Sequence, residues 1–337
     1  MSDNETNLKD RLAVLVRAFE GRSVLVVGDL VADQFVFGEI SRVSREAPVM
    51  ILRHERTETV PGGAANCAMN LASLGARASI VGVVGDDEAG RVLLEKLKGA
   101  GVDCTGVVVD ANLRTTTKVR LLAGHAHSPR QQVIRLDYES AALDDTSVIG
   151  ATVRAVAERS READAFIISD YNYGVANAET WAALGSRVAD VPVLVDSRFR
   201  LGEFKGFTSA TPNEDEVEQV VGRRLETVDE LAEEGERLRV RLGLESLLIT
   251  RGRNGMLLVE RGREALFLEA VGTHDAVDVT GAGDTVIATY TLALASGAGA
   301  GDAARLANHA GGVVVLKRGT ACIHADELVA SVLGEGA

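Results

Sequence analysis

Residues 278–285 read Asp-Val-Thr-Gly-Ala-Gly-Asp-Thr, and the apolar run Val-Ile-Ala follows at 286–288. The pattern predicts a glycine-rich turn that opens an apolar helix, with Asp284 just inside the helix start. Gly281 and Gly283 allow a ligand to approach the backbone closely, and the helix N-terminus adds the positive end of a dipole. The segment therefore predicts a site that binds an anion.

The chemistry that this turn favours is phosphoryl transfer. The N–H groups of Gly281, Ala282 and Gly283 would stabilise the transferring phosphoryl group, and Asp284 would accept a proton from the attacking hydroxyl. On the glycine–acid pattern alone, an ordinary turn with an acid in the first helical turn is an equal alternative. A Walker A loop is excluded because the sequence has no Gly-Lys dipeptide. A dinucleotide fingerprint is disfavoured because Val286 stands in place of its third glycine.

Short apolar runs that are typical of buried parallel strands recur along the chain. They lie at residues 22–28, 78–84, 164–169, 191–196 and 246–250. Helical patterns alternate with them, at residues 63–74, 86–100, 148–161, 179–189, 227–242, 283–295 and 300–317. This alternation predicts an α/β fold, a doubly wound and mostly parallel sheet with helices on both faces.

Two stretches, residues 34–60 and 112–139, break the alternation because each holds strand-like runs with no helix between them. We interpret them as one small β-sheet lid inserted into a single domain that spans residues 1–337. Two surface hairpins with no joint role are the alternative. Because exposed strands need covering, we expect a homodimer that pairs through the lid.

The charge balance limits the partners. The chain of 337 residues carries 49 acidic and 36 basic side chains, a formal net charge of −13. This excess argues against nucleic acid or an anionic membrane as a partner, since both need a basic face. The three cysteines have no paired spacing, the N-terminus is polar, and no apolar run approaches the roughly 20 residues that cross a bilayer. We therefore expect a soluble cytoplasmic protein.

The segment Pro-Gly-Gly-Ala-Ala-Asn-Cys-Ala-Met-Asn at residues 61–70 is a second candidate site. Gly62 and Gly63 permit close backbone approach at the start of an Ala-rich helix, and Asn66 and Asn70 lie one turn apart on the same face. A side-chain amide both donates and accepts hydrogen bonds, which suits sugar hydroxyls. On these residues alone, a tight turn before a helix with polar asparagines is the open alternative.

Together these motifs resemble those of the ribokinase-like (PfkB) carbohydrate kinases, over roughly residues 12–333. Within that family the chain looks closest to the D-glycero-beta-D-manno-heptose-7-phosphate kinase part of the bacterial bifunctional heptose synthesis enzyme. The blocks that carry the resemblance lie at residues 33–38, 41–49 (SRVSREAPV), 61–76, 115–122 (TTTKVRLL), 131–139 (QQVIRLDYE), 169–174 (SDYNYG) and 278–288.

On the sugar side, the resemblance implies that Gly62, Gly63 and Asn66 bind the substrate. It also implies that Asp33, which follows the first apolar run, accepts a hydrogen bond from a sugar hydroxyl. A turn-capping role is the alternative for Asp33.

Arginines are the expected partners of a substrate phosphate, because a guanidinium holds phosphate by paired hydrogen bonds. Arg135 is one candidate, and a cross-strand ion pair is the alternative for Arg135 and Asp137. Residues 196–200 read Asp-Ser-Arg-Phe-Arg where the group has Asp-Pro-Lys-Gly, so Arg198 is a second candidate. The remaining candidates are Arg42, Arg45 and Arg200, and we expect at least one contribution from 41–49 and one from 198–200.

The resemblance also implies a site for ATP with Mg²⁺. Residues 211–216 read Thr-Pro-Asn-Glu-Asp-Glu, and the family has an Asn-x-x-Glu motif here, so Asn213, Glu214, Asp215 and Glu216 are nucleotide-binding candidates. Glu216 would hold Mg²⁺ through water. Taken alone, the segment favours a helix cap followed by an acidic first turn.

Other positions match weaker parts of the same nucleotide and ion sites. Thr250, Gly252 and Asn308 match positions that line the family's nucleotide pocket. Asp278 and Thr280 match a site for a monovalent cation, for which K⁺ is the candidate.

The reaction that the resemblance implies is transfer of the γ-phosphate of ATP to the anomeric hydroxyl of D-glycero-D-manno-heptose 7-phosphate, a step towards ADP-heptose and the lipopolysaccharide core. A PfkB kinase for another sugar, sugar phosphate or nucleoside is the first alternative. A non-catalytic sugar- or nucleotide-binding regulator on the same fold is the second. Because the chain ends at Ala337, we expect it to lack the nucleotidyltransferase half of the bifunctional enzyme.

Overall fold

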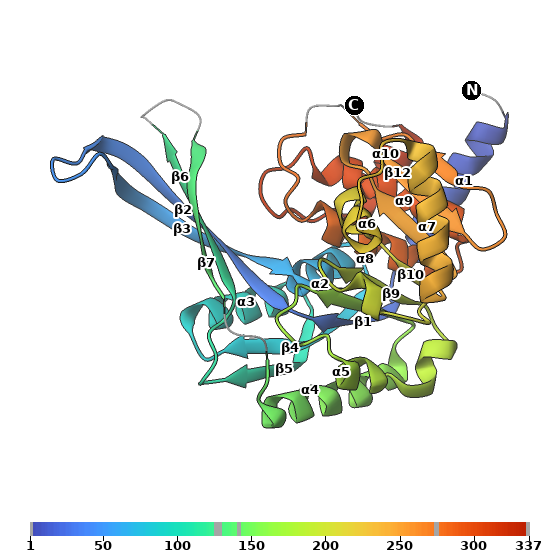
Figure 1. The fold of residues 1–337 in the computed structure, drawn as a ribbon, viewed down its shortest axis with the longest axis horizontal. Helices are drawn as coiled ribbons and strands as arrows, with labels where there is room; N and C mark the ends of the chain where they lie inside the picture. Colours follow the sequence, from blue (N-terminus) through green and yellow to red (C-terminus); the bar gives the residue numbers. More distant parts are fainter. Residues whose placement is uncertain (1–2, 125–129, 140–142, 273–275, 335–337) are drawn as a thin grey trace.

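The computed structural model describes residues 3–124, 130–139, 143–272 and 276–334 (Figure 1). Within these residues the strands form two sheets, one of nine strands and one of four. The smaller sheet projects from the rest of the molecule, as Figure 1 shows at the left. The expected separation of a small sheet from a large helix-flanked sheet is therefore confirmed.

The large sheet has the strand order β13-β12-β11-β10-β9-β8-β1-β4-β5. All neighbours from β11 to β5 are parallel, and β12 and β13 add an antiparallel edge. Its strands are β1 (Ser23–Gly28), β4 (Arg77–Gly85), β5 (Asp103–Asp110), β8 (Ala165–Asp170), β9 (Val193–Ser197), β10 (Ser209–Ala210), β11 (Ser246–Thr250), β12 (Met256–Glu260) and β13 (Leu266–Leu268).

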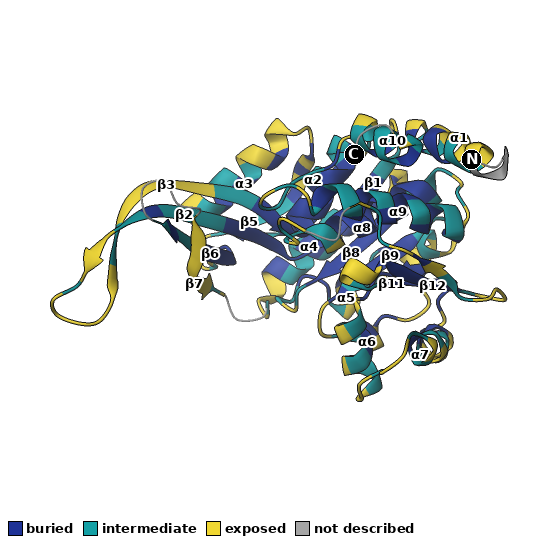
Figure 2. Ribbon diagram, turned by 90° about the horizontal axis from the view of Figure 1, so that it is seen from above, coloured by how far each residue is buried: buried dark blue, intermediate teal, exposed yellow. Residues whose placement is uncertain are grey.

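Helices cover both faces of this sheet, as the doubly wound prediction requires (Figures 1 and 2). Those packed on one face are α1 (Asp3–Arg17), α2 (Ala64–Ser73), α3 (Glu88–Gly99), α8 (Ala282–Ala295), α9 (Ala300–Val314) and α10 (Ala325–Leu333). Those packed on the other face are α4 (Thr146–Arg159), α5 (Ala178–Ala182), α6 (Glu214–Val221) and α7 (Val228–Leu242). Short 3-10 turns lie at η1 (Ser160–Glu162), η2 (Gly185–Ala189), η3 (Leu201–Glu203) and η4 (Gly252–Asn254).

The core consists of two apolar layers separated by the sheet. Alternate residues of β1 point to opposite faces, so Val24 and Val26 join one layer while Leu25 and Val27 join the other. All four side chains are buried. A strand that is apolar on both faces is what a covered parallel sheet requires.

The helix predicted over residues 179–189 is not continuous. The α-helix covers only Ala178–Ala182, and a 3-10 turn covers Gly185–Ala189. Gly185 has a φ of 58°, a left-handed conformation that an α-helix cannot contain.

The small sheet has the order β3-β2-β6-β7. Its strands are β2 (Leu30–Val43), β3 (Met50–Gly63), β6 (Thr117–Gly124) and β7 (Gln131–Tyr138). The two hairpins, β2–β3 and β6–β7, are antiparallel as expected, and β2 and β6 join them in parallel. The β2–β3 hairpin extends beyond both ends of the predicted 34–60 segment. Residues 125–129, between β6 and β7, lie outside the described residues.

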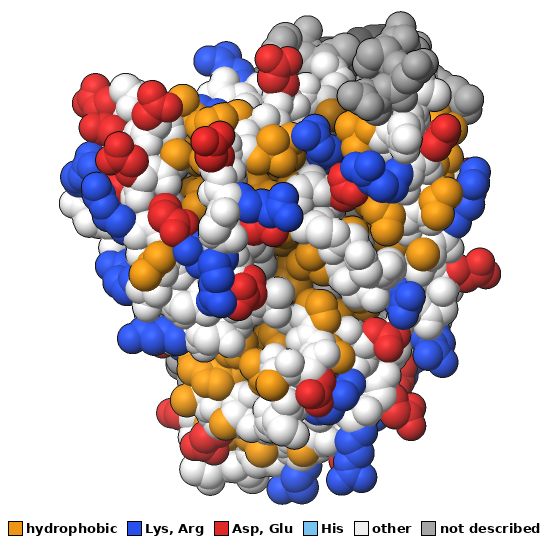
Figure 3. All heavy atoms as spheres, turned by 90° about the vertical axis from the view of Figure 1, so that its right-hand side faces the viewer, with side chains coloured by type: hydrophobic (Ala, Val, Ile, Leu, Met, Phe, Trp, Pro, Cys, Tyr) orange, Lys and Arg blue, Asp and Glu red, His pale blue; other side chains and the backbone are white. Residues whose placement is uncertain are grey.

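Two further observations concern membranes and nucleic acid as partners. Among the described residues, no helix combines the length and apolar character that a bilayer crossing needs. On the face shown in Figure 3, Lys and Arg side chains alternate with Asp and Glu, so that face carries no continuous basic patch.

Candidate active site

The candidate site lies where the strand order of the large sheet reverses. β1 has β4 on one side and β8 on the other, so the connections after β1 and after β8 diverge. In open α/β sheets this crevice, at the carboxyl ends of the strands, is where ligands bind. Residue Asp29 follows β1 here, and Tyr171 follows β8.

Asp284 lies in the first turn of α8 and is buried. Its Oδ2 accepts a hydrogen bond from Asn66 Nδ2 at 2.8 Å, and its Oδ1 accepts from the Tyr171 hydroxyl at 3.2 Å and the Cys67 thiol at 3.5 Å. Burial raises the pKa of Asp284 to about 6, although these three donors lower it. The carboxyl group is therefore held in place and ionised at neutral pH, as a general base must be.

The turn before Asp284 has the glycine geometry that the sequence predicts. Gly281 caps α8 with a φ of 80°, and a Cβ there would lie 2.5 Å from Asn66 Nδ2. A Cβ on Gly283 would meet nothing within 4 Å, so the space beside it is open. The Ala282 N–H donates to Val279 O at 3.2 Å. The first N–H groups of a helix lack partners within the helix itself, and the open space at this helix start lies beside Gly283.

The Gly-Gly segment brings the small sheet to α8. Gly63 has a φ of 56°, and a Cβ there would lie 2.8 Å from Asp29 O. A Cβ on Gly62 would overlap the Asp33 carboxylate. Asn66 and Asn70 lie on the buried side of α2, and the Thr285 hydroxyl donates to Asn70 Oδ1 at 3.1 Å. The structure thus brings Asn66 and Asn70 of α2 into contact with α8, and Gly62 against Asp33.

Asp33 forms an ion pair with Arg120 of β6, a residue outside our sequence-based candidates. Nearby Lys118, also on β6, is buried at 8% exposure. Burial lowers the pKa of Lys118, Asp33 raises it, and the positive charges of Arg135 and Arg198 lower it further. Lys118 therefore lies near two arginines, Arg135 of β7 and Arg198 of the loop after β9, and near two acids, Asp33 and Asp137.

Arg135 does not form the cross-strand ion pair considered above. Its Nε donates to Asp137 Oδ1 at 2.7 Å, two residues along the same strand. The Arg200 side chain is engaged in a structural contact, because its Nε donates to Asp170 Oδ2 at 3.3 Å. Arg42 is exposed next to the β2–β3 turn, which lies far from α8 in Figure 1. Within this chain, the 41–49 block is not brought to the site.

On the other side of the turn lies a largely apolar cavity of about 190 Å³. Its lining includes the predicted residues Thr250, Gly252 and Asn308 together with Ala282 and Gly283. Asn308 is fixed by a hydrogen bond from its Nδ2 to Glu269 O at 2.6 Å. An apolar slot that opens on a helix N-terminus suits a flat aromatic base next to its phosphates.

The four residues of the acidic segment 213–216 fall into two pairs that have different neighbours. Asn213 and Glu216 form a capping box at the start of α6, with Asn213 Oδ1 accepting from Glu216 N at 2.8 Å. Glu214 and Asp215 line a different surface hollow, and Glu214 pairs with Arg251 at 2.8 Å. The structure therefore does not bring these two acids to the cavity beside Gly283.

Asp278 lies at the start of the same glycine-rich turn, and its carboxylate accepts two backbone hydrogen bonds. Its Oδ1 accepts from Thr280 N at 2.9 Å and its Oδ2 accepts from Gly319 N at 2.9 Å. Burial alone raises the pKa of Asp278, but these donors outweigh it and lower the pKa below its usual value.

Sequence analysis missed several residues of this site. Tyr171 and Cys67 both contact Asp284. Asp196 lies at the end of β9, and its pKa is raised well above the usual value by burial and by the charges of Glu216 and Asp284. The available signal for Asp196 was its position at the carboxyl end of a buried apolar run.

Comparison with known proteins agrees with this geometry. The family described as pfkB family carbohydrate kinase matches residues 22–326. The chain is 42% identical over 335 residues to the bifunctional protein HldE of Caulobacter sp. (strain K31), covering 98% of this chain and 67% of that protein. It is 43% identical over 311 residues to the D-beta-D-heptose 7-phosphate kinase of Bordetella bronchiseptica, covering 90% and 94%. The chain spans about two thirds of the length of the bifunctional relatives it matches.

Solved structures share the fold. A ribokinase of Arabidopsis thaliana, solved with ribose and ATP, aligns with a TM-score of 0.71 at 20% identity, covering 93% of this chain and 99% of that one. Phosphofructokinase-2 of Escherichia coli aligns with a TM-score of 0.75 at 20% identity, with the same coverages. The fold, the matched residues and the identities to heptose kinases lead to one conclusion: the chain belongs to the pfkB family of carbohydrate kinases.

Proposed function

We propose that this carbohydrate kinase transfers the γ-phosphate of ATP to the anomeric hydroxyl of D-glycero-D-manno-heptose 7-phosphate. The observation that carries the proposal is a cluster of charged side chains in which cations outnumber acids: Lys118, Arg120, Arg135 and Arg198 against Asp33 and Asp137. Two of these four cations, Arg120 and Arg135, already pair with the two acids. A sugar phosphate brings negative charge that balances the other two, whereas a neutral sugar does not. The 43% identity to a D-beta-D-heptose 7-phosphate kinase supports the same substrate.

The residues of this chain then take the following roles. Asp33, Gly62, Gly63 and Asn66 bind the sugar hydroxyls, and Asp284 accepts the proton of the attacking hydroxyl. The N–H groups of residues 281–283 stabilise the negative charge of the transferring phosphoryl group. Thr250, Gly252 and Asn308 hold the nucleotide.

Magnesium fits the acidic side of the site. Glu216 and Asp284 are close enough to raise the pKa of Asp196 by repulsion, and a divalent cation relieves such repulsion. Among the described residues, no group of three His, Cys, Asp or Glu side chains is placed to hold a metal ion directly. Glu216 would therefore hold Mg²⁺ through water, and the ion would neutralise charge on the phosphates of ATP. Asp278 and Thr280 are our candidates for a K⁺ site.

A coupled assay of ADP release tests the substrate. It compares heptose 7-phosphate with fructose 6-phosphate, fructose 1-phosphate, ribose, fructose and adenosine. We expect the highest kcat/KM for heptose 7-phosphate. A preference for any unphosphorylated compound would overturn the heptose assignment, and binding of ATP and sugar without ADP release would favour a non-catalytic regulator.

We further propose a homodimer that pairs through the small sheet. The sheet exposes large apolar side chains on its edge strand β7, including Ile134 at 56% and Leu136 at 47% exposure. Figure 2 shows β7 and much of β3 as exposed. A second copy would cover this surface and the strand edge.

Because ATP is made in the cytoplasm, we place the reaction there.

The double substitution Ile134→Asp with Leu136→Asp should convert the dimer to a monomer, because two charges then oppose burial of the sheet. Light scattering coupled to gel filtration measures the mass. The control is Val240→Asp, which changes an equally exposed apolar residue on α7 and should leave the mass unchanged. A wild-type protein that stays monomeric at high concentration would contradict the dimer.

A further inference from the structure

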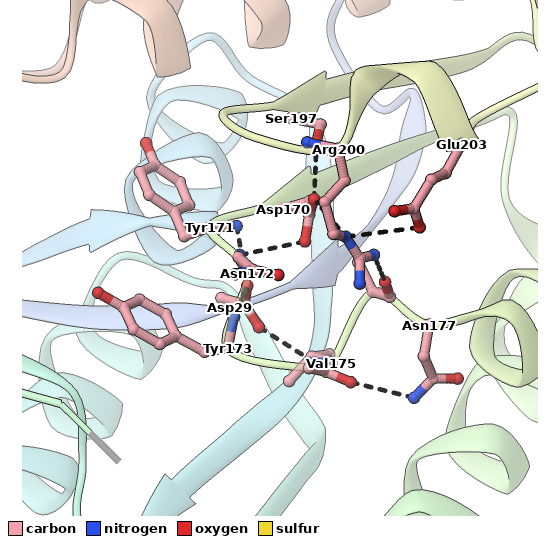
Figure 4. Close-up of polar contacts among 12 residues, drawn as sticks. Asp29, Asp170, Tyr171, Asn172, Tyr173, Val175, Asn177, Ser197, Arg200 and Glu203 are labelled. Carbon is pink, nitrogen blue, oxygen red and sulfur yellow. Dashed lines mark hydrogen bonds and ion pairs between the residues drawn. The ribbon is translucent and has the colours of Figure 1, made fainter. Parts of the chain in front are cut away.

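The segment between β8 and α5 carries Tyr171, and its backbone is held by a buried carboxylate from another part of the chain. Asp29 is 1% exposed. Its Oδ2 accepts from the Tyr171 N–H at 2.8 Å and from the Tyr173 N–H at 3.0 Å, and its Oδ1 accepts from the Val175 N–H at 3.1 Å. Figure 4 shows Asp29 beneath this loop. Three backbone donors thus converge on one side chain.

The backbone of Asp29 holds a second segment of the site. Its carbonyl oxygen accepts from Ala64 N, the first residue of α2, at 3.1 Å. Two residues later, Asn66 donates to Asp284. Asp29 therefore contacts both segments whose side chains donate to the Asp284 carboxylate, and it contacts neither carboxylate oxygen itself.

A second buried acid stiffens the same loop. Asp170 Oδ2 accepts from the Ser197 hydroxyl at 2.7 Å, and Asp170 Oδ1 accepts from Asn172 N at 3.2 Å. Asn172 has a φ of 67°, the one positive φ among non-glycine residues that the structure describes. Asparagine adopts this left-handed region more readily than other non-glycine residues, and the bond from Asn172 N to Asp170 holds the turn.

We propose that Asp29 is a positioning residue for phosphoryl transfer, which holds the loop so that the Tyr171 hydroxyl is set against Asp284. The proposal rests on the proposed role of Asp284 as the general base. A carboxylate is suited to this position because it accepts hydrogen bonds on both oxygens. An asparagine would turn an N–H₂ group towards one of the backbone donors and lose at least one of the three bonds.

The fall of kcat/KM at low pH, which is the acid limb of the pH–rate profile, depends on the hydrogen bonds that surround Asp284. Asp284 must be ionised to act, so kcat/KM should fall as the pH drops below about 6, the pKa that burial gives this group. Burial raises the pKa of Asp29 to about 6 as well, and an acid limb that came from Asp29 itself would move to lower pH or disappear in Asp29→Asn. The titratable groups that face it are Cys67, Tyr171, Asp33, Asp196 and Cys322.

The two kinds of role for Asp29 predict opposite shifts. The Tyr171 hydrogen bond lowers the pKa of Asp284, so loss of that bond moves the acid limb to higher pH. Loss of the Asp29 charge by itself would move the limb to lower pH, since a negative neighbour raises a carboxyl pKa.

The test compares Tyr171→Phe, Asp29→Asn and the double variant in the full-length protein. We expect each single variant to raise the acid limb by about half to one pH unit. We expect kcat at pH 7 to fall about 3- to 10-fold with the KM for ATP unchanged, the scale of one typical lost hydrogen bond. The double variant should shift no more than the larger single one, because both act through one contact.

Asp164→Asn is the matched control. Asp164 also accepts from a backbone donor of β1, the Ser23 N–H at 2.9 Å, but at the opposite end of the strand. Its pH profile should match the wild type.

Stability is checked first by thermal unfolding. Kinetics are measured on Asp29→Asn or Asp29→Ser, whichever unfolds within about 5 °C of the wild type. An unchanged or lowered acid limb in the Asp29 variant would overturn the proposal, and so would a double variant whose shift is the sum of the two. Failure of both Asp29 variants to fold would assign Asp29 a purely structural role and also overturn it. Failure of the proposed function is distinguishable, because Asp284→Asn would then keep its turnover.

Discussion

The Asp284→Asn variant is expected to turn over heptose 7-phosphate about 10²–10⁴-fold more slowly than the wild type while still binding ATP. The amide keeps the shape of the side chain but cannot accept the proton of the attacking hydroxyl. The nucleotide cavity is lined by other residues, so ATP affinity should survive. Coupled ADP release gives kcat, and isothermal titration gives the dissociation constant for ATP.

A suitable control for this change is Asp326→Asn. Asp326 is also an acid in the first turn of a helix, α10, but its side chain is exposed and lies outside the site. Its turnover should equal that of the wild type. Wild-type turnover in Asp284→Asn would show that the base has been assigned wrongly.

Arg198→Ala is expected to raise the KM for heptose 7-phosphate by about 30- to 100-fold, the scale of a lost charge-assisted hydrogen bond to phosphate. The KM for a neutral sugar should hardly change, because a neutral sugar offers no anion to Arg198. Initial rates measured with both classes of sugar separate the two effects.

Arg91→Ala serves as the matched control, since Arg91 is an exposed arginine on α3 whose ion pair with Asp86 lies outside the site. It should leave both KM values unchanged. Equal increases of KM for phosphorylated and neutral sugars in Arg198→Ala would mean that this residue supports the site without contacting the phosphate.

The fold could be predicted from the sequence because its strands are short and apolar on both faces. Residues 22–28 and 246–250 both form strands of the parallel sheet, as expected. Strand β5 was missed because its sequence, Asp-Cys-Thr-Gly-Val-Val-Val-Asp, mixes polar and apolar residues on an edge. Strand β10 was missed because it has only two residues.

The site could be predicted in part. The glycine turn and Asp284 are adjacent in the sequence, so their pattern identifies them together. Tyr171 and Asp29 contribute through contacts across 113 and 142 residues of chain, to Asp284 and to Tyr171 respectively. Such contacts are set by the order of strands in the sheet, which the alternation of strands and helices does not specify. The separation of Glu214 from the cavity likewise depends on where α6 packs.

The length of the β2–β3 hairpin has a mechanical consequence. Strand β2 has 14 residues, and its first residue, Leu30, directly follows Asp29, whose carbonyl oxygen accepts from Ala64 N at the start of α2. At about 3.3 Å per residue the strand is about 46 Å long, so a rotation of about 10° at its base would carry its far end about 8 Å. The base of the hairpin is linked to Asp284 through α2, since Asn66 of that helix donates to the Asp284 carboxylate. In a pair of molecules joined by these sheets, a small rotation at the base of one hairpin would displace its far end by a larger distance against the neighbouring copy.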